Sequence, residues 1–116
     1  MNRRRTGSVY EQMAAVYLEK KGMHVIARNF RTRGSEIDLI ARDDDYLVFV
    51  EVKYRSDAAK GYALEAVDTR KQRAIIAAAK VFLHRFRFAE DTPCRFDVIG
   101  MDGKEITHIE NAFWME

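Results

Sequence analysis

The sequence is poor in the residues that build covalent or metal-linked scaffolds, and it has no long apolar run. It contains one cysteine, Cys94, and one proline, Pro93, so the chain can form neither an intrachain disulfide nor a zinc site made of several cysteines. Its longest strictly apolar runs, such as 74–79, have five or six residues, whereas a membrane span needs about 20. No apolar signal-peptide core follows the basic first residues. We therefore expect a soluble, cytoplasmic protein without a membrane partner.

The length and composition fit one folded domain over residues 1–116. A globular chain of this length buries roughly two-thirds of its unfolded surface, so it needs no disulfide or metal in order to fold. Hydrophobic residues make up 47% of the sequence and charged residues 33%, which excludes a disordered or low-complexity chain. We expect residues 1–6, with their run of three arginines, to form a flexible basic arm.

The net charge of +2 is unevenly distributed. Residues 1–33 contain eight Lys or Arg and two Glu, a balance of +6, whereas residues 34–116 contain 12 Lys or Arg and 16 Asp or Glu, a balance of −4. A basic segment joined to an acidic body indicates an anionic partner held near clustered carboxylates. On charge alone, a solvated basic terminus is an equally good interpretation.

Hydrophobic periodicity predicts two helices and five strands. The first helix runs from about 6–8 to 21 and the second from 70 to 86, after a capping Asp68 or Thr69. The expected strands are 24–30, 36–41, 46–53, 95–101 and 105–109. The predicted fold class is therefore α/β, with a mixed sheet flanked by helices in the order αβββαββ.

The second and third predicted strands carry acidic residues among core residues. A hairpin loop of residues 43–46 would pair Arg42 with Leu47. Counting back from that pair places Asp38 directly opposite Glu51, and their Cβ atoms would then lie about 5 Å apart. Both acids interrupt apolar runs, and charges within core strands need a physical reason.

Two carboxylates at that separation repel each other unless a cation offsets their charge. Mg²⁺ prefers oxygen ligands and takes one or two carboxylates together with water and substrate phosphate, a role that suits Asp38 and Glu51. Lys53 shares the face of Glu51 because side chains alternate along a strand. It would orient an attacking water or stabilise charge on the phosphate. The plain structural alternative is a solvated cluster of charges on a surface hairpin.

These residues resemble the Asp…Glu-x-Lys signature of the restriction-endonuclease-like (PD-(D/E)xK) nuclease superfamily, which includes archaeal Holliday-junction resolvases. A wider match is carried by the segments RNFRTRGSEIDLIARDDDYLVFVEVKYR, EAVDTRKQRAIIAAA, RFDVIG and HIENAF. With these segments, nearly the whole chain from Gly7 to Phe113 resembles the YraN-like family of small uncharacterised bacterial proteins.

The resemblance implies a restriction-endonuclease-like core with a nuclease-type site on the sheet. Asp38 and Glu51 match the metal-binding acids of the superfamily, and Lys53 matches its catalytic lysine. Glu11 matches a first-helix glutamate that completes the metal site in the resolvase branch, and it stands at the edge of the apolar arc of the first predicted helix. The carbonyl of Val52 is a further ligand by the same analogy.

Five residues are candidates for contacts with nucleic acid. Lys71 and Gln72 match a polar pair that family members carry at the start of the long helix. Arg31, Arg33 and Arg55 flank the acidic hairpin beside aromatic residues. Arginine contacts with phosphate bind nucleic acid without reading its sequence.

We therefore expect a metal-dependent endonuclease that uses Mg²⁺ or Mn²⁺ to hydrolyse phosphodiester bonds in nucleic acid, with structured or branched DNA favoured over RNA. The alternative is a non-catalytic, nucleic-acid-binding accessory protein that keeps the nuclease fold. A homodimer is expected only by analogy with the resolvases. The apolar residues 113–115 would either close the core or take part in a dimer contact.

Overall fold

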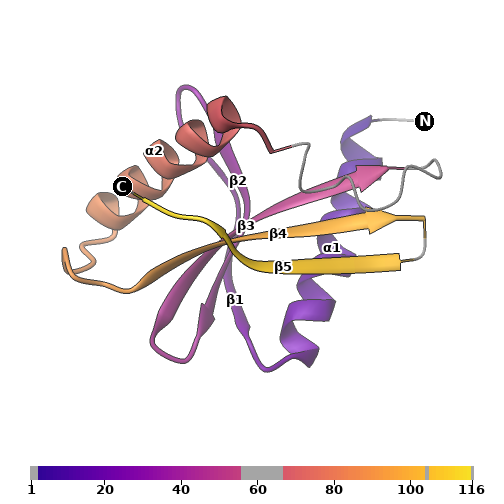
Figure 1. Cartoon of the computed structure of the whole chain (residues 1–116), viewed down its shortest axis with the longest axis horizontal. Helices are drawn as coiled ribbons and strands as arrows, with labels where there is room; N and C mark the ends of the chain where they lie inside the picture. Colours follow the sequence, from indigo (N-terminus) through magenta and orange to yellow (C-terminus); the bar gives the residue numbers. More distant parts are fainter. Residues whose placement is uncertain (1–2, 56–66, 104, 116) are drawn as a thin grey trace.

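A computed structural model describes residues 3–55, 67–103 and 105–115, without the side chains of residues 3–8 and 55. The chain forms α1 (Arg3–Lys20), β1 (His24–Arg31), β2 (Glu36–Asp43), β3 (Tyr46–Arg55), α2 (Thr69–Arg85), β4 (Cys94–Asp102) and β5 (Glu105–Phe113) (Figure 1). This order confirms the predicted α/β class and the arrangement αβββαββ. No described helix is both long and apolar enough to cross a membrane.

The five strands form one mixed sheet in the order β1-β2-β3-β4-β5. Neighbouring strands are antiparallel except β3 and β4, which are parallel. A parallel pair requires a long crossover connection, and the connection between these two strands contains α2. Because β3 is the middle strand, a side chain near its end is close to both neighbouring strands.

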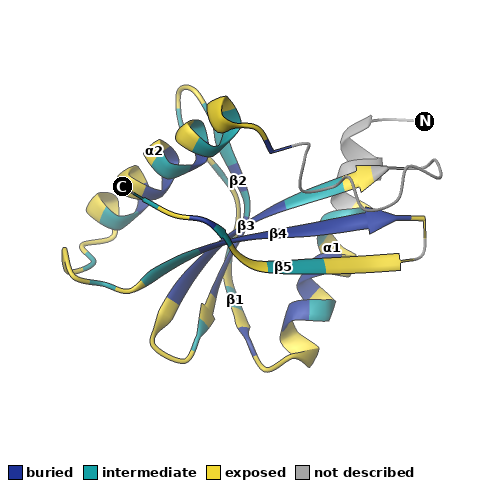
Figure 2. Ribbon diagram, viewed as in Figure 1, coloured by how far each residue is buried: buried dark blue, intermediate teal, exposed yellow. Residues whose placement is uncertain are grey.

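The two helices pack on opposite faces of the sheet. On one face, Phe82 of α2 contacts Phe49 edge-on, with ring centroids 5.9 Å apart, inside a cluster of buried side chains. On the other face, Leu18 of α1 belongs to a second buried cluster together with Val50. Successive residues of β3 thus enter opposite clusters, as expected for a strand covered on both faces. Figure 2 shows buried residues along the middle of the sheet and exposed residues on the outer sides of both helices.

Two element boundaries differ from the prediction by more than two residues. The first helix begins at Arg3, so residues 3–5 form its first turn; arginine is a good helix former. Residues 1 and 2 of the predicted arm lie outside the described part. The last strand continues past Ile109 to Phe113, because Asn111 takes a φ of 53° at an irregularity in the pairing. Asparagine tolerates that left-handed backbone better than most residues.

The β2–β3 hairpin has the predicted register with a tighter turn. Arg42 pairs with Leu47 as expected, but Asp43 also pairs with Tyr46. The turn therefore consists of residues 44–45 instead of a four-residue loop, and its first residue has a φ of 53°. Aspartate is one of the residues that adopt this conformation at low cost.

The three apolar residues 113–115 near the C-terminus differ in their burial. Phe113 is 6% exposed and, with Met115, packs on the α2 side of the sheet. Trp114 points outward and is 63% exposed. Two of the three residues therefore close the core, while the dimer contact remains a prediction.

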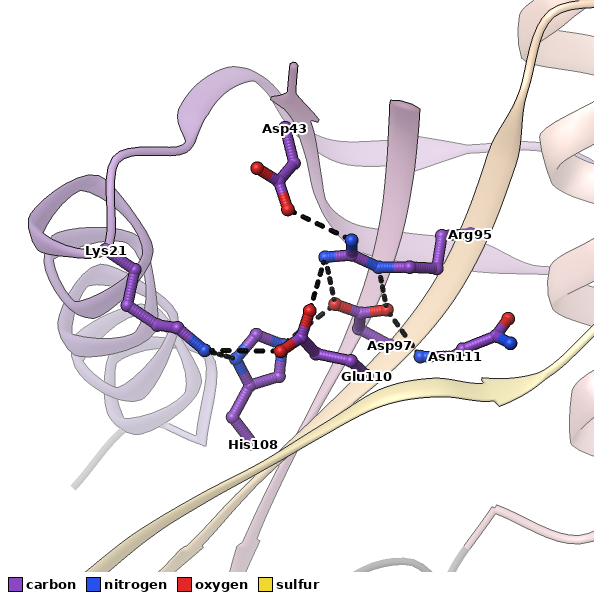
Figure 3. A network of polar contacts seen from close by, with 7 residues as sticks. All are labelled: Lys21, Asp43, Arg95, Asp97, His108, Glu110 and Asn111. Carbon is purple, nitrogen blue, oxygen red and sulfur yellow. Dashed lines mark hydrogen bonds and ion pairs between the residues drawn. The ribbon is translucent and has the colours of Figure 1, made fainter. Parts of the chain in front are cut away.

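A buried polar network joins β4 and β5 to the end of β2 and to the residue after α1 (Figure 3). Its centre is Asp97, which is 0% exposed. The carboxylate accepts hydrogen bonds from Nε and Nη2 of Arg95 at 2.9 and 3.0 Å, from Nε2 of His108 at 2.8 Å and from the backbone amide of Asn111 at 3.0 Å. Burial alone would raise the pKa of Asp97, but these hydrogen bonds outweigh burial and lower it.

Two outer contacts orient this network. Nζ of Lys21 lies 2.9 Å from Nδ1 of His108. An ammonium group only donates, so Nδ1 is the acceptor and Nε2 carries the hydrogen that His108 donates to Asp97. Arg95 also reaches Asp43 at 3.0 Å. Because the side chain of His108 is only 2% exposed, we interpret the network as a structural link between elements.

Candidate functional site

The predicted acidic residues lie where β2 and β3 separate. Backbone pairing between these strands is regular as far as Leu39 and Val50. Beyond that pair, Oδ2 of Asp38 accepts a hydrogen bond from the backbone amide of Val52 at 2.8 Å. In Figure 1 the two strands run together from their hairpin and then point apart. The side chain of Asp38 therefore bridges the opening between the strands.

Two glutamates approach Asp38 at this opening. Nδ2 of Asn29, on β1, donates to Oε1 of Glu11 at 2.8 Å and to Oε1 of Glu36 at 2.9 Å. One carboxylate oxygen from each of Glu11, Glu36 and Asp38 lies within 4.8 Å of the others. Among the residues that the structure describes, no other three His, Cys, Asp or Glu side chains converge so closely. The helix and the second strand thus bring three acids to one point.

Glu51 is the fourth acid and lies beside this group. It is 4% exposed, and its carboxyl group hydrogen-bonds to that of Asp38. Its Oε2 is 3.5 Å from Nζ of Lys53 and 3.4 Å from Nζ of Lys71. Lys53 lies on the same strand as Glu51 and Lys71 lies in the first turn of α2, so the strand and the helix both supply positive charge to Glu51.

The environment of Asp38 disfavours its charged form. Burial, followed by the negative charge of Glu51 and the hydrogen bond to it, raises the pKa of Asp38 to about 9. The backbone amide of Val52 acts in the opposite direction, and Glu11 adds a further increase. Without a cation, Asp38 therefore keeps its proton at neutral pH.

The donor set of this site fits a hard divalent cation. Mg²⁺ binds oxygen at about 2.1 Å, so oxygens on opposite sides of the ion lie roughly 4 Å apart. The spacing of up to 4.8 Å among Glu11, Glu36 and Asp38 is close to that value, and three carboxylates are ligands that Mg²⁺ and Mn²⁺ prefer. Two predicted ligands, Glu11 and Asp38, belong to this group of three. Glu51 lies beside this group, and the predicted ligand roles of Glu51 and of the Val52 carbonyl stay predictions.

The three arginines predicted to contact nucleic acid have different surroundings. Nε of Arg31 lies 3.6 Å from Oε2 of Glu36, next to the acidic group. Arg33 is exposed in the turn between β1 and β2. The side chain of Arg55 lies outside the described residues. Of the two predicted arginines whose side chains are described, Arg31 is therefore the one that lies at the site.

The two residues of the predicted polar pair at the start of α2 also have different contacts. Lys71 reaches Glu51, whereas Nε2 of Gln72 donates to the carbonyl of Val67 at 3.0 Å. Of the two predicted capping residues, Asp68 caps the helix, because its Oδ1 accepts from the amide of Lys71 at 2.9 Å. Lys71 thus joins the site, while Gln72 supports the segment that leads into the helix.

A cavity of about 480 Å³ opens next to the acids, between the turn before β2 and the first turns of α2. Its lining includes Ser35, Arg70 and Lys71, together with the capping Asp68. The Oγ of Ser35 is buried and has no hydrogen-bond partner among the described residues. Hydroxyl and cationic groups are donors that a phosphate accepts from.

Two residues of the site, Glu36 and Asn29, were missed from the sequence. Glu36 stands two positions before Asp38, and residues two apart on a strand share a face, so this signal was available. Asn29 has a φ of 50°, a conformation that asparagine tolerates. No sequence pattern distinguishes an asparagine that adopts it within a strand.

Comparison with known proteins identifies the family of the chain. A model of the uncharacterised protein family UPF0102 matches residues 10–101. The chain belongs to the UPF0102 family. This confirms the assignment to the YraN-like proteins that the sequence motifs predicted. The matched range of the UPF0102 model includes all the acids and lysines of the site.

Relatives in this family match over almost their full length. A UPF0102 protein of Lachnoclostridium phytofermentans is 50% identical over 113 residues, which cover 97% of this chain and 96% of the relative. A UPF0102 protein of Pectobacterium carotovorum is 46% identical, with 97% of both chains covered. One from a Janthinobacterium species is 44% identical over 91% of this chain and 85% of its own length.

Asp38→Asn is expected to stabilise the metal-free protein. The folded-state pKa of about 9 lies above the ordinary value of 3.8, so wild type loses stability as the pH rises from about 4 towards 9. Asparagine cannot ionise and removes this loss. We expect a gain on the order of 2 kcal/mol at pH 8, or at least about 4 °C in Tm, measured by thermal unfolding in EDTA.

Two comparisons make this prediction specific. The gain should shrink at pH 5, where most of the wild-type loss is absent, and Asp45→Asn in the exposed turn should change Tm little. Added Mg²⁺ should raise the Tm of wild type and not that of Asp38→Asn. A lower Tm for Asp38→Asn in EDTA at pH 8 would contradict the electrostatic interpretation.

Proposed function

We propose that this UPF0102 protein is a metal-dependent endonuclease that hydrolyses phosphodiester bonds in nucleic acid, with structured or branched DNA as its substrate. The observation that supports this proposal most is the convergence of Glu11, Glu36 and Asp38 beside a buried Glu51 that contacts Lys53. Hard oxygen ligands next to a positioned lysine suit hydrolysis of a phosphodiester. The preference for branched DNA rests on the resemblance to the resolvases, as does the expectation of a homodimer.

In the proposed reaction, Glu11, Glu36 and Asp38 hold the divalent cation. When bound, Mg²⁺ or Mn²⁺ supplies a Lewis acid for the phosphate and lowers the pKa of a coordinated water. Glu51 holds the carboxyl group of Asp38 in position through their direct contact. Lys53, whose side chain is 28% exposed, is placed to orient the attacking water and to stabilise negative charge on the phosphate.

The cavity beside the acids offers a place for the nucleic-acid backbone. Arg70 and Lys71 line it, and Arg31 lies next to Glu36 of the acidic group. Contacts of this kind bind phosphates independently of base sequence. Recognition in this proposal therefore depends on the shape of the nucleic acid.

The test is a cleavage assay on labelled DNAs of equal length: blunt duplex, single strand, flap and four-way junction. Each is incubated with Mg²⁺, Mn²⁺ or EDTA, and binding is recorded on the same samples. We expect wild type to cut in the presence of either metal. Asp38→Asn should lose at least about 100-fold in rate, and Asp45→Asn, which removes an exposed turn carboxylate, should cut like wild type.

The possible results separate the proposal from its alternative. Metal-dependent cleavage that is lost only in Asp38→Asn supports the nuclease. Binding of DNA without cleavage in either metal favours the non-catalytic accessory protein. If the protein neither binds nor cleaves any of the DNAs, both functions are contradicted.

A further inference from the structure

A second cavity lies against α2, next to the C-terminal residues. It has a volume of about 430 Å³, and its lining includes Thr69, Arg73 and Lys80 of α2 and, from the end of the chain, Trp114. Helical positions three or four apart share one side of a helix, so residues 69, 73, 76 and 80 form a continuous stripe. We call this cavity the Trp114 groove.

The side chains of the groove have the chemistry of a binding surface for a flat anionic ligand. Trp114 is 63% exposed although both of its chain neighbours pack on the core. Arg73 and Lys80 are exposed, and neither forms an ion pair with another described residue. Within the part of the chain that the structure describes, the lining contains no Asp or Glu. An indole face beside two cations suits an aromatic ring that is attached to negatively charged groups.

Ile76 and Ala77 supply an apolar part of the lining, while Thr69 and Gln72 add polar groups at one end. The volume lies within the range of pockets that hold small ligands. A nucleobase presents a stackable face only where it is not already stacked between neighbours in a duplex. The groove therefore fits an unpaired nucleotide better than a paired one.

We propose that the Trp114 groove binds an unpaired nucleotide of a nucleic-acid strand, with the base stacked on Trp114 and the flanking phosphates on Arg73 and Lys80. This inference rests on the proposed function and adds a substrate feature to it, an unpaired strand next to the cleavage site. Lys71 reaches the acids and Gln72, the next residue, lines the groove. The two sites therefore lie on different sides of one helix, about 10–12 Å across, a span that a few nucleotides bridge.

The test uses Trp114 as its own probe, because it is the only tryptophan in the sequence. The full-length protein is titrated with a 12-residue oligothymidylate in EDTA, so that no cleavage occurs. We expect the tryptophan fluorescence to be quenched at saturation. Fluorescence anisotropy of the labelled oligonucleotide then gives the affinity of each variant, with a blunt duplex of equal length as the second ligand.

Trp114→Ala is expected to weaken oligothymidylate binding roughly tenfold, and Trp114→Phe less, because phenylalanine keeps a stacking face. The double variant Arg73→Ala/Lys80→Ala should reduce the slope of log affinity against log salt by about 1.4, the value for two phosphate contacts on a single strand. Blunt-duplex binding should change little in each variant. Lys20→Ala, an exposed lysine on α1, is the matched control and should leave binding unchanged.

The proposal for the groove would be overturned if the fluorescence were not quenched, or if Trp114→Ala and the double variant bound oligothymidylate with unchanged affinity. Thermal unfolding verifies that each variant is folded, and Trp114→Phe repeats the test with a smaller change. If the fluorescence is quenched and the variants bind oligothymidylate more weakly, but wild type shows no metal-dependent cleavage, the proposal for the groove is supported and the nuclease function is contradicted. If Trp114→Ala cleaves flap DNA at the wild-type rate and binds it with unchanged affinity, the nuclease function is supported and the proposed role of the groove is contradicted.

Discussion

Lys53→Met is expected to reduce metal-dependent cleavage of DNA at least about 100-fold, equivalent to about 2.7 kcal/mol of transition-state stabilisation. Methionine keeps the length and the apolar part of the side chain and removes only the ammonium group. That group lies 3.5 Å from Oε2 of Glu51 and is part-exposed, so it is available to the phosphate. Binding of DNA should stay within about twofold of wild type, measured by anisotropy on the same substrates.

Lys71→Met is the matched control, because Nζ of Lys71 lies 3.4 Å from the same oxygen of Glu51. If the two lysines served only to balance the charge of Glu51, both variants would lose activity to a similar extent. If Lys53 acts on the reacting phosphate, Lys53→Met should lose at least about tenfold more than Lys71→Met. Equal losses would contradict the catalytic assignment of Lys53.

Local patterns were sufficient to predict the order of elements. The apolar run around Val50 identifies a central strand because helices cover the sheet on both faces at this strand. Asp68 marks the start of α2 because its side chain caps the helix. What the patterns missed were backbone conformations with positive φ, at Asn111 in β5 and at the first residue of the hairpin turn. These depend on single residues and leave no periodic signal.

The candidate site was predictable only as far as strand geometry reaches. Counting residues along one hairpin was enough to bring Asp38 close to Glu51. Whether Glu11 and Lys71 arrive at the same place depends on how each helix packs on its face of the sheet, which no local count determines. The family resemblance supplied the expectation for Glu11, and the structure supplied Lys71 as a partner of Glu51.

The surface of α1 shows a similar limit. The helix has a broad apolar arc, but the fold buries only part of it, including Ala14 and Leu18. Val9, Met13 and Val16 stay 40–52% exposed. Periodicity indicates which side of a helix is apolar, whereas the width of the covered strip depends on the neighbouring elements.

Asp97→Asn is expected to destabilise the protein by about 3–5 kcal/mol at pH 7, the range for breaking a buried ion pair. The two carboxylate oxygens of Asp97 accept from Arg95, His108 and the amide of Asn111. An asparagine amide is itself a donor, so in either orientation its NH₂ group faces donors where an acceptor is needed. His108 cannot adjust by changing its tautomer, because its other nitrogen accepts from Lys21. The measurement is urea unfolding at pH 7.

Asp43→Asn is the control, because Asp43 contacts the same guanidinium from a partly exposed position and should cost at most about 1 kcal/mol. The pH dependence adds a second criterion. The folded-state pKa of Asp97 lies below its ordinary value of 3.8, so its charge stabilises wild type above about pH 4, and this contribution is lost as the pH falls further. Asp97→Asn lacks that contribution, so the two unfolding free energies should converge below pH 4. A difference that stays constant down to pH 3 would show that Asp97 acts through packing and not through its charge.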